Sequence, residues 1–371
     1  MKILIISQYF YPETGACSNR ITEFTKLWVL SGHQVSVLTS FPNYPIGRIY
    51  DGYREKKDSF LKESMEGVVI YRVKPIEARI DGKVARLKNY IGFMMKALYY
   101  IRRLPRHDVV IGTIGSLFTG IVGLIAGKIL KVPFILEVRD IISLQIKATG
   151  YSNRIIMKLV EILENLMMKT SQHIVTVTDG FRNEIIRRGI PGEKVSVVKN
   201  GASFHRKAEI LDMQDKDFCL LLKTIRSAKT KGRMILSYCG TLGISQNIHE
   251  MIKYVEKYKD QVIFLIIGDG ACRNKLIEEI DRYKLSHTVY YHLNVPESHI
   301  VSLLRLSDFS FVKLLNSEEF GSFILSKIFH IMREKCLPVF IGPRGDAWNI
   351  VKQIDPRLCF NDGIDRIIPA F

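Results

Sequence analysis

Short apolar runs of strand length alternate with stretches of helical spacing through the first half of the chain, and this order constrains the fold more than any other feature. The expected strands span residues 3–7, 34–38, 109–112, 134–138 and 173–177. The expected helices lie near 19–31, 86–104, 117–130 and 153–169. Strands that follow one another through helical crossovers form a parallel sheet with helices on both faces. We therefore predict an α/β fold built on a doubly wound sheet.

The same alternation restarts in the second half of the chain. After the turn at Asn200-Gly201 comes a polar, charged stretch at 204–233. Further strands are expected at 235–239, 262–267, 289–292, 309–315 and 339–341. A chain of 371 residues exceeds what one such layered unit usually holds. The sequence therefore predicts two Rossmann-like domains, at 1–200 and 201–371.

Composition and charge narrow the class of protein. An apolar content of 47% and a charged content of 25% are those of a soluble globular enzyme, and the net charge of +17 favours an anionic partner. The apolar run at 121–130 contains Lys128 and falls short of the roughly 20 residues of a membrane span. We expect no transmembrane helix.

The sequence gives no sign of a metal site or a cofactor. The six cysteines include no CxxC pair, which argues against a zinc site or a disulfide framework and fits a reducing cytoplasm. No pair of carboxylates stands at a strand end, and Asp215 and Asp217 are assigned to a solvated loop. We expect metal-independent chemistry.

The segment 308–345 is predicted to form a strand, a polar loop around Gly321, a helix at 324–332 and a second strand. Loops of this kind aim backbone N–H groups and the positive end of a helix at an anion, so a diphosphate would fit there. The alternative is that this segment is only scaffold, because the same pattern occurs in any open α/β sheet.

The loop at 11–20 leaves the carboxyl end of the first strand, where open parallel sheets bind ligands. It lacks the GxGxxG pattern, which argues against a dinucleotide-dependent dehydrogenase. The alternative is an ordinary helix start capped by Thr14 or Ser18.

Several short motifs carry a family resemblance from residue 1 to about 345. They are Met1-Lys-Ile-Leu-Ile-Ile-Ser-Gln-Tyr-Phe-Tyr-Pro-Glu-Thr-Gly-Ala, Gly32-His-Gln-Val-Ser-Val-Leu-Thr, Phe41-Pro-Asn-Tyr-Pro-Ile-Gly-Arg, Val138-Arg-Asp, Tyr238-Cys-Gly-Thr-Leu-Gly, Ile267-Gly-Asp-Gly, Leu303-Leu-Arg-Leu-Ser-Asp and Ser326-Lys-Ile-Phe. Together they resemble bacterial glycosyltransferases of family 4 (group 1), and within these the fucosamine transferases of O-antigen and capsule biosynthesis. These proteins have the two-domain GT-B fold.

The resemblance implies that the first domain takes the acceptor, that the second takes a UDP-sugar, and that the sugar is transferred with retention. Gly15 would let the backbone approach the donor phosphates, because it has no Cβ. Arg139 and Asp140 are the candidate catalytic residues, with a local salt bridge as the alternative. The other donor-binding candidates are Gly240, Thr241, Gly243, Gly268, Asp269, Gly270, Ser326, Lys327 and His330.

The chain departs from the family pattern in the donor loop. Relatives carry two glutamates seven residues apart, and the second holds the ribose hydroxyls. If Glu318-Glu-Phe-Gly supplies the first glutamate, Ser326 takes the second position; if Ser326-Lys-Ile-Phe-His is aligned instead, His330 takes it. We take His330 as the ribose candidate, with an ordinary helix residue as the alternative.

Other differences concern basic residues and the C-terminus. Thr241 and Gln246 replace family cations, so Lys327 and Arg344 become the nearest basic candidates for the diphosphate. Relatives continue with helices beyond the last strand, whereas this sequence stops at Phe371. We therefore expect a divergent or truncated family member, whose activity stays open.

The region 79–107 is basic and apolar at once and carries one acid, Asp81. Such a helix can lie in a membrane interface, although its apolar residues could equally be core with a solvated basic rim. Nucleic acid is a poorer explanation, because no RRM, KH or zinc-finger pattern accompanies the charge. The candidate membrane-contact residues are Arg86, Lys88, Arg102 and Arg103.

The leading hypothesis is transfer of an N-acetylfucosamine or similar deoxy-aminosugar from UDP to an undecaprenyl-diphosphate-linked acceptor, by a peripheral protein on the cytoplasmic face of the inner membrane. The alternative is a non-catalytic relative that binds the membrane or a partner protein. A nucleotide-sugar epimerase is disfavoured, because the GxGxxG pattern and a Tyr-x-x-x-Lys pair near a cofactor site are missing.

Overall fold

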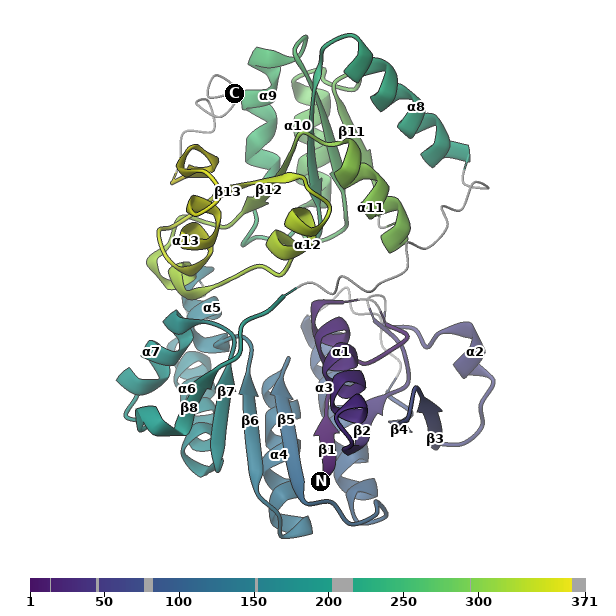
Figure 1. The fold of residues 1–371 in the computed structure, drawn as a ribbon, viewed down its shortest axis with the longest axis vertical. Helices are drawn as coiled ribbons and strands as arrows, with labels where there is room; N and C mark the ends of the chain where they lie inside the picture. Colours follow the sequence, from purple (N-terminus) through teal and green to yellow (C-terminus); the bar gives the residue numbers. More distant parts are fainter. Residues whose placement is uncertain are drawn as a thin grey trace. The chain divides into compact units, whose positions relative to one another are not determined.

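A computed structural model describes residues 1–13, 15–44, 47–76, 83–150, 153–201, 216–293 and 295–361. The chain divides into two compact units, each built around its own sheet (Figure 1). Unit 1 comprises Met1–Ser143 and Ser152–Lys199, and unit 2 comprises Leu144–Tyr151 and Asn200–Phe371. The predicted boundary at residue 200 differs in one segment, because the contacts of Leu144–Tyr151 group it with unit 2.

Unit 1 contains an eight-stranded sheet in the order β3-β4-β2-β1-β5-β6-β7-β8, and all neighbours are parallel except β3 and β4. The strands are β1 (Lys2–Ile6), β2 (Gln34–Ser40), β3 (Phe60–Met65), β4 (Val68–Val73), β5 (Val109–Ile114), β6 (Phe134–Val138), β7 (His173–Thr176) and β8 (Val195–Val197). The predicted strands are all present. The sequence analysis missed the β3–β4 hairpin and β8, which contribute the two edge strands.

The helices of unit 1 connect these strands. They are α1 (Ala16–Leu30), α2 (Asp51–Arg54), α3 (Lys83–Ile101), α4 (Leu117–Leu130), α6 (Arg154–Thr170), α7 (Asp179–Arg187) and the 3-10 turn η1 (Gly192–Lys194). Helix α5 (Ile142–Ala148) begins in unit 1 and continues into the segment grouped with unit 2.

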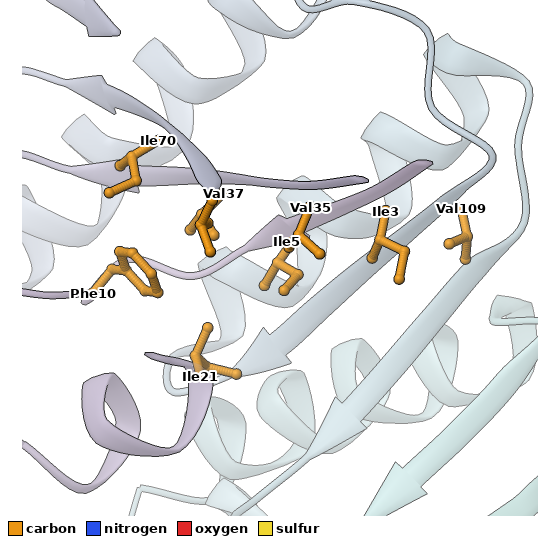
Figure 2. Packing of buried hydrophobic residues seen from close by; sticks show 9 residues of the cluster. Ile3, Ile5, Phe10, Ile21, Val35, Val37, Ile70 and Val109 are labelled. Atoms are coloured by element: carbon orange, nitrogen blue, oxygen red, sulfur yellow. The ribbon is translucent and has the colours of Figure 1, made fainter. Parts of the chain in front are cut away.

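The core of unit 1 forms around the central strand β1 (Figure 2). Ile3 and Ile5 of β1 stand in register with Val35 and Val37 of β2, and all four side chains are buried. A central strand of a parallel sheet is covered on both faces, so it needs a continuous apolar run rather than an alternating one. This explains why the start of the sequence reads as a strand.

Unit 2 contains a six-stranded parallel sheet in the order β11-β10-β9-β12-β13-β14. Its strands are β9 (Met234–Cys239), β10 (Val262–Ile267), β11 (Val289–His292), β12 (Phe309–Lys313), β13 (Leu337–Ile341) and β14 (Cys359–Phe360). Its helices and 3-10 turns are α8 (Lys216–Thr230), η2 (Ile248–Met251), α9 (Ile252–Val255), η3 (Glu256–Tyr258), α10 (Arg273–Arg282), α11 (Glu297–Leu306), η4 (Glu318–Ser322), α12 (Lys327–Arg333), α13 (Asp346–Lys352) and η5 (Pro356–Leu358).

Helix α8 corrects the prediction of a polar stretch at 204–233. Phe218, Leu222 and Ile225 are buried in the core of unit 2, and their spacing of three to four residues is that of one helix face. Asp217 lies in this helix rather than in a solvated loop, and Asp215 lies outside the described residues. The charged residues of the stretch that α8 covers therefore belong to an amphipathic helix.

No helix in the described part of the chain combines the length and the apolar character needed to cross a membrane.

Candidate functional site

In unit 2, two glycine-containing loops lie side by side at the carboxyl ends of neighbouring strands. Strands β9 and β10 are parallel, with Cys239 in register with Ile267, so the loops that follow them leave the same edge of the sheet. The N–H of Gly240 donates to the carbonyl of Ile267 at 2.8 Å, and the N–H of Leu242 donates to the carbonyl of Asp269 at 3.0 Å. This edge is where open parallel sheets bind ligands.

The close approach of these loops requires glycine. A Cβ on Gly268 would lie 1.8 Å from the carbonyl oxygen of Gly240, and a Cβ on Gly270 would lie 2.5 Å from that of Leu242. Both glycines also have positive φ angles, of +152° and +157°. The second loop therefore accepts no side chain at these two positions.

Lys327 places its ammonium group against the first of these loops. Its Nζ lies 4.0 Å from the centroid of the Tyr238 ring, and a Cβ on Gly240 would lie 2.6 Å from the same Nζ. The Tyr238 hydroxyl donates to the carbonyl of Thr241 at 2.6 Å, which fixes the ring under the lysine. Residues far apart in the sequence thus surround one amino group.

The ammonium of Lys327 lacks a hydrogen-bond acceptor. The Nζ atom is shielded from solvent and makes no hydrogen bond within the described structure, although the side chain as a whole is partly exposed. Burial lowers the pKa of this lysine to about 8. A buried cation without acceptors is costly, so this position is suited to receive an anion.

The remaining donor candidates take different positions. Thr241 and Asp269 are exposed, and the Oδ1 of Asp269 accepts the N–H of Gly270 at 2.8 Å. A Cβ on Gly243 would lie 2.6 Å from the Oε1 of Gln246. Arg344 lies over the Trp348 ring at 5.8 Å. The structure thus brings the glycine loops together with Lys327.

Helix α12 is shorter than predicted, because residues 324–326 precede it. Ser326 occupies its N-cap position without a capping side-chain hydrogen bond. His330 lies in the middle of this seven-residue helix, three residues after Lys327, so both project from the same helix face.

Glu319, the glutamate of the other predicted register, is held by contacts within unit 2. Glu318 and Glu319 lie in η4, and the Oε1 of Glu319 is 2.8 Å from the Nζ of Lys147. Hydrogen bonds from Lys147 and Ser317 lower the pKa of Glu319 to about 2. The Glu319 carboxylate therefore already forms an ion pair with Lys147.

In unit 1, Arg139 and Asp140 directly follow β6. The Arg139 side chain hydrogen-bonds to Cys17 in the first turn of α1, and its Nε is buried without a hydrogen-bond partner. Among the described residues no contact at ion-pair distance joins Arg139 to Asp140, but their charges interact: burial raises the pKa of Asp140 to about 6, and Arg139 opposes this shift.

Glu137 of β6, two residues before Arg139, forms a buried ion pair that the sequence analysis missed. Its Oε1 lies 2.8 Å from the Nε of Arg20, and both side chains are almost fully buried. The Arg20 guanidinium also lies 4.3 Å from the Phe24 ring and donates to the carbonyl of Val198 at 3.1 Å. This contact joins α1 to β6 directly beside the candidate catalytic residues.

Glu13 is a second buried carboxylate that the sequence analysis missed, and it joins the loops after β1 and β2. Its Oε1 accepts the N–H groups of Asn43 and Tyr44 at 2.8 and 2.9 Å, and its Oε2 accepts that of Phe10 at 3.0 Å. Burial raises its pKa to about 7, although the three N–H donors oppose this shift. Its place in the Tyr11-Pro-Glu motif was the only signal in the sequence.

Gly15 lies at the start of α1 with extended backbone angles, a conformation that any residue adopts. A Cβ at this position would meet the Tyr44 ring at 3.4 Å, which is an ordinary contact. The fold of unit 1 therefore does not itself require glycine here.

Helix α3 carries an exposed apolar stripe, which we call the α3 stripe. It consists of Val84, Leu87, Ile91, Met95 and Tyr99, with exposed fractions of 68%, 46%, 38%, 60% and 64%. The opposite side of the helix buries Phe93, Ala97 and Ile101. The buried face agrees with the alternative that these apolar residues belong to the core, and membrane contact by the exposed face stays a prediction.

Basic residues flank the α3 stripe. Lys88, Arg102 and Arg103 are exposed, and the Arg103 guanidinium lies 5.1 Å from the rings of both Tyr99 and Tyr100. The side chain of Arg86, together with Arg79 and Asp81, lies outside the described residues.

Sequence comparison finds two family models and one related protein. The model "Glycosyl transferase 4-like domain" matches residues 15–201, and the model "Glycosyl transferases group 1" matches residues 223–326. The putative colanic acid biosynthesis glycosyl transferase WcaI of Escherichia coli K12 is 21% identical over 320 residues, which cover 83% of this chain and 75% of that protein.

Comparison with solved structures shows the same fold at low sequence identity. Sucrose-phosphate synthase from Thermosynechococcus elongatus has a TM-score of 0.66 and 12% identity, over 100% of this chain and 94% of that one. WaaG, a glycosyltransferase involved in lipopolysaccharide biosynthesis, has a TM-score of 0.65 and 11% identity, over 99% and 90%. Anabaena Alr3699/HepE in complex with UDP-glucose has a TM-score of 0.64 and 14% identity, over 100% and 88%.

Proposed function

Because the chain belongs to the glycosyl transferase 4-like family and is a glycosyltransferase with the GT-B fold, we propose that it moves a sugar from a UDP-sugar held by unit 2 to an acceptor held by unit 1. The observation that supports this donor most strongly is the buried Nζ of Lys327, which has no acceptor among the described residues. A diphosphate supplies anionic oxygens that such an ammonium binds with charge-assisted hydrogen bonds.

The surroundings of Lys327 suit a diphosphate in shape as well as in charge. The backbone at Gly240, Gly268 and Gly270 carries no side chains, so phosphate oxygens could approach the main chain closely. His330 projects from the same face of α12 as Lys327, and we propose that it contacts the ribose of the UDP group. The solved structure of Alr3699/HepE with UDP-glucose supports this class of donor.

We propose that Arg139 and Asp140 act on the transferred sugar or on the acceptor, and that the sugar keeps its anomeric configuration. Positive charge at the diphosphate would come from Lys327, so the transfer would proceed without a metal ion. Activity that EDTA abolishes and manganese restores would contradict this part of the proposal.

The proposed product is a surface polysaccharide of the O-antigen or capsule type. The related WcaI is described for colanic acid biosynthesis, which supports this general class of pathway. The proposed donor sugar is N-acetylfucosamine or a similar deoxy-aminosugar, and the proposed acceptor is linked to undecaprenyl diphosphate. The α3 stripe and its flanking cations support a peripheral position on the cytoplasmic face of the inner membrane, because a helix with exposed apolar and basic residues can lie in the lipid interface.

The test is a transfer assay with radiolabelled UDP-sugars and an undecaprenyl-diphosphate-linked acceptor, which measures label in the lipid fraction. We expect label with the wild-type protein and at least a 100-fold loss with Asp140→Asn or Arg139→Ala, since residues that contact the reacting sugar act on the transition state. UDP binding should persist in both variants. A wild-type protein that binds vesicles but neither UDP nor any UDP-sugar would favour the alternative of a non-catalytic relative. The loss of the family's second glutamate, replaced by Ser326 in one register and by His330 in the other, brings this alternative into consideration.

A further inference from the structure

The motif at 41–48 carries part of the family resemblance, and the chemistry above gives it no role. In the structure, the segment that follows β2 forms a pocket in unit 1 of about 390 Å³. The polar residues that line the pocket are Asn43, Tyr44, Arg48, Tyr50, Asp51 and Arg54.

The walls of the pocket are held by contacts from behind. Glu13 fixes the backbone N–H groups of Asn43 and Tyr44, as described above. The Tyr50 hydroxyl donates to the carbonyl of Tyr44 at 2.7 Å, and a guanidinium nitrogen of Arg54 donates to the carbonyl of Ile49 at 3.2 Å. A pocket whose walls are fixed in advance binds a ligand with a smaller entropic cost.

The charges of the pocket favour an anion. Arg54 lies 3.0 Å from the carboxylate of Asp51, whereas Arg48 is exposed and forms no ion pair with any described residue. The lining of the pocket thus carries two guanidinium groups and one carboxylate, which is paired with Arg54. A guanidinium binds carboxylate and phosphate groups through paired hydrogen bonds.

The other lining groups suit a sugar ring. Tyr44 and Tyr50 offer aromatic surface with a polar hydroxyl, a combination that contacts both the apolar and the polar parts of a ligand. The Oδ1 of Asn43 is buried and has no hydrogen-bond donor in the described structure, while its Nδ2 donates to Ser40 and Phe41. An acceptor without a partner is matched by the hydroxyl donors of a sugar.

Tyr44 connects the pocket to the loop that precedes α1. Its ring lies 3.4 Å from the position of a Cβ on Gly15, and its centroid is 5.2 Å from that of Tyr9. The Tyr44 side chain therefore separates the pocket from the loop that contains Gly15, which the family resemblance places near the donor phosphates.

We propose that this pocket binds an acidic group of the acceptor, a carboxylate or a phosphate next to a sugar ring, with Arg48 as its main charged contact. The identification of the ligand as the acceptor rests on the proposed function. The acidic group could come from a uronic acid or from the diphosphate of a lipid carrier, because the shared chemistry is an anion beside sugar hydroxyls.

Ligand-observed NMR titrations can test this proposal with methyl β-D-glucuronide, inorganic pyrophosphate and methyl β-D-glucoside as probes. Lys327→Met is used as the background, so that pyrophosphate does not report on the donor site. We expect saturable binding of at least one anionic probe, with the glucuronide indicating a uronate and pyrophosphate indicating the carrier. Uncharged glucoside should bind at least ten-fold more weakly than the anionic probe that binds.

Arg48→Ala should weaken binding of that probe ten-fold or more, whereas Arg106→Ala, an exposed arginine outside the pocket, should leave it unchanged. Melting temperatures of both variants should match that of their background, since both side chains are exposed. Absence of saturable binding by either anion, or equal binding after Arg48→Ala, would overturn the proposal. A separate titration of the wild-type protein with UDP reports on the donor site, so failure of the proposed function is recognised independently.

Discussion

The Nζ of Lys327 lies 4.0 Å from the centroid of the Tyr238 ring, and no described residue offers it a hydrogen-bond acceptor. The aromatic face stabilises the cation in part, by about 0.5–2 kcal/mol. The rest of the cost of burying an ammonium group has no compensation in the described structure. A site that leaves such a group without an acceptor is prepared for an anionic ligand rather than for maximal stability.

If His330 contacts the ribose as proposed, replacing it by glutamate should supply the carboxylate that the family resemblance implies in this register. A charge-assisted hydrogen bond to the ribose is worth roughly 1.5–3 kcal/mol, so the affinity for UDP should rise about ten-fold or more. His330→Gln is the matched control, because its amide has a similar reach without the charge. Calorimetric titration with UDP measures both variants, and a lower melting temperature with unchanged or weaker binding of His330→Glu would contradict the ribose contact.

Gly268→Ala should disrupt the two loops of the proposed donor site. Its Cβ would lie 1.8 Å from the carbonyl oxygen of Gly240, and the backbone would keep a φ of +152°. We expect a loss of at least about 3 kcal/mol in unfolding free energy, together with weaker UDP binding. Gly232→Ala is the control, since φ there is +76° and no atom lies within 4 Å; its cost should be about 1–2 kcal/mol. Equal denaturation midpoints for the two variants would show that the loops do not need this close approach.

The buried carboxyl of Glu13 should make stability depend on pH. Its pKa is about 7 in the folded protein against 4.5 for an ordinary glutamate, because burial disfavours the charged form. A raised pKa contributes stability that is complete below pH 4.5 and is lost as the pH rises to about 7, an effect of about 3 kcal/mol.

Chemical denaturation of the wild-type protein and Glu13→Gln from pH 4 to 8 measures this contribution. The stability of the wild type relative to the variant should fall between pH 4.5 and 7 and stay constant above that. A difference that is flat or rises across this range would mean that the three N–H donors outweigh burial and keep the carboxylate ionised.

Charge reversal beside the α3 stripe should weaken binding to anionic vesicles. Each basic residue near an anionic surface contributes about 1 kcal/mol, so Lys88→Glu, Arg102→Glu and Arg103→Glu together should reduce partitioning 100-fold or more. Added salt should release the wild-type protein in the same way, because screening weakens these contacts.

A sedimentation assay measures partitioning to vesicles, and two further variants serve as comparisons. Met95→Ser should weaken binding to neutral vesicles as well, because Met95 is 60% exposed and contributes apolar contact. Lys223→Glu, an exposed position on α8, should have no effect. Unchanged partitioning after the triple reversal would exclude the α3 stripe as the membrane contact.

The sequence predicts the central strands well, because burial on both faces imposes a continuous apolar run. β6 and β10 have the same bounds in the prediction and in the structure. Strand β3 was missed because it is an edge strand with half its residues polar, and α8 was missed because Lys and Arg residues on its exposed side make the whole segment read as charged. Where only one face of an element is buried, the apolar signal is correspondingly weaker.

The candidate site was predicted only in part, because its contacts join residues far apart in the chain. The resemblance selected Lys327 and the glycines, but the position of the lysine over Tyr238 follows from the packing of α12 on β12 and β13, of which β12 is the neighbour of β9. Neither the Arg20–Glu137 ion pair nor the bonds of Glu13 to the 43–44 backbone leaves a local pattern in the sequence. Such contacts depend on the register of the strands, which a single sequence does not reveal.

The most direct test of the donor site is the affinity for UDP of the wild-type protein and of Lys327→Met, measured by calorimetric titration with Lys223→Met as the control. Lys327→Met keeps roughly the length of the side chain and removes its charge. A loss of UDP affinity in this variant should therefore come from the contact with the diphosphate. We predict that the wild-type protein and Lys223→Met bind UDP equally and that Lys327→Met binds UDP at least ten-fold more weakly. The melting temperature of Lys327→Met should be unchanged or higher, because a buried cation without acceptors is unfavourable in the folded protein. Equal affinity in Lys327→Met and the wild type, or no UDP binding by the wild type, would contradict the account.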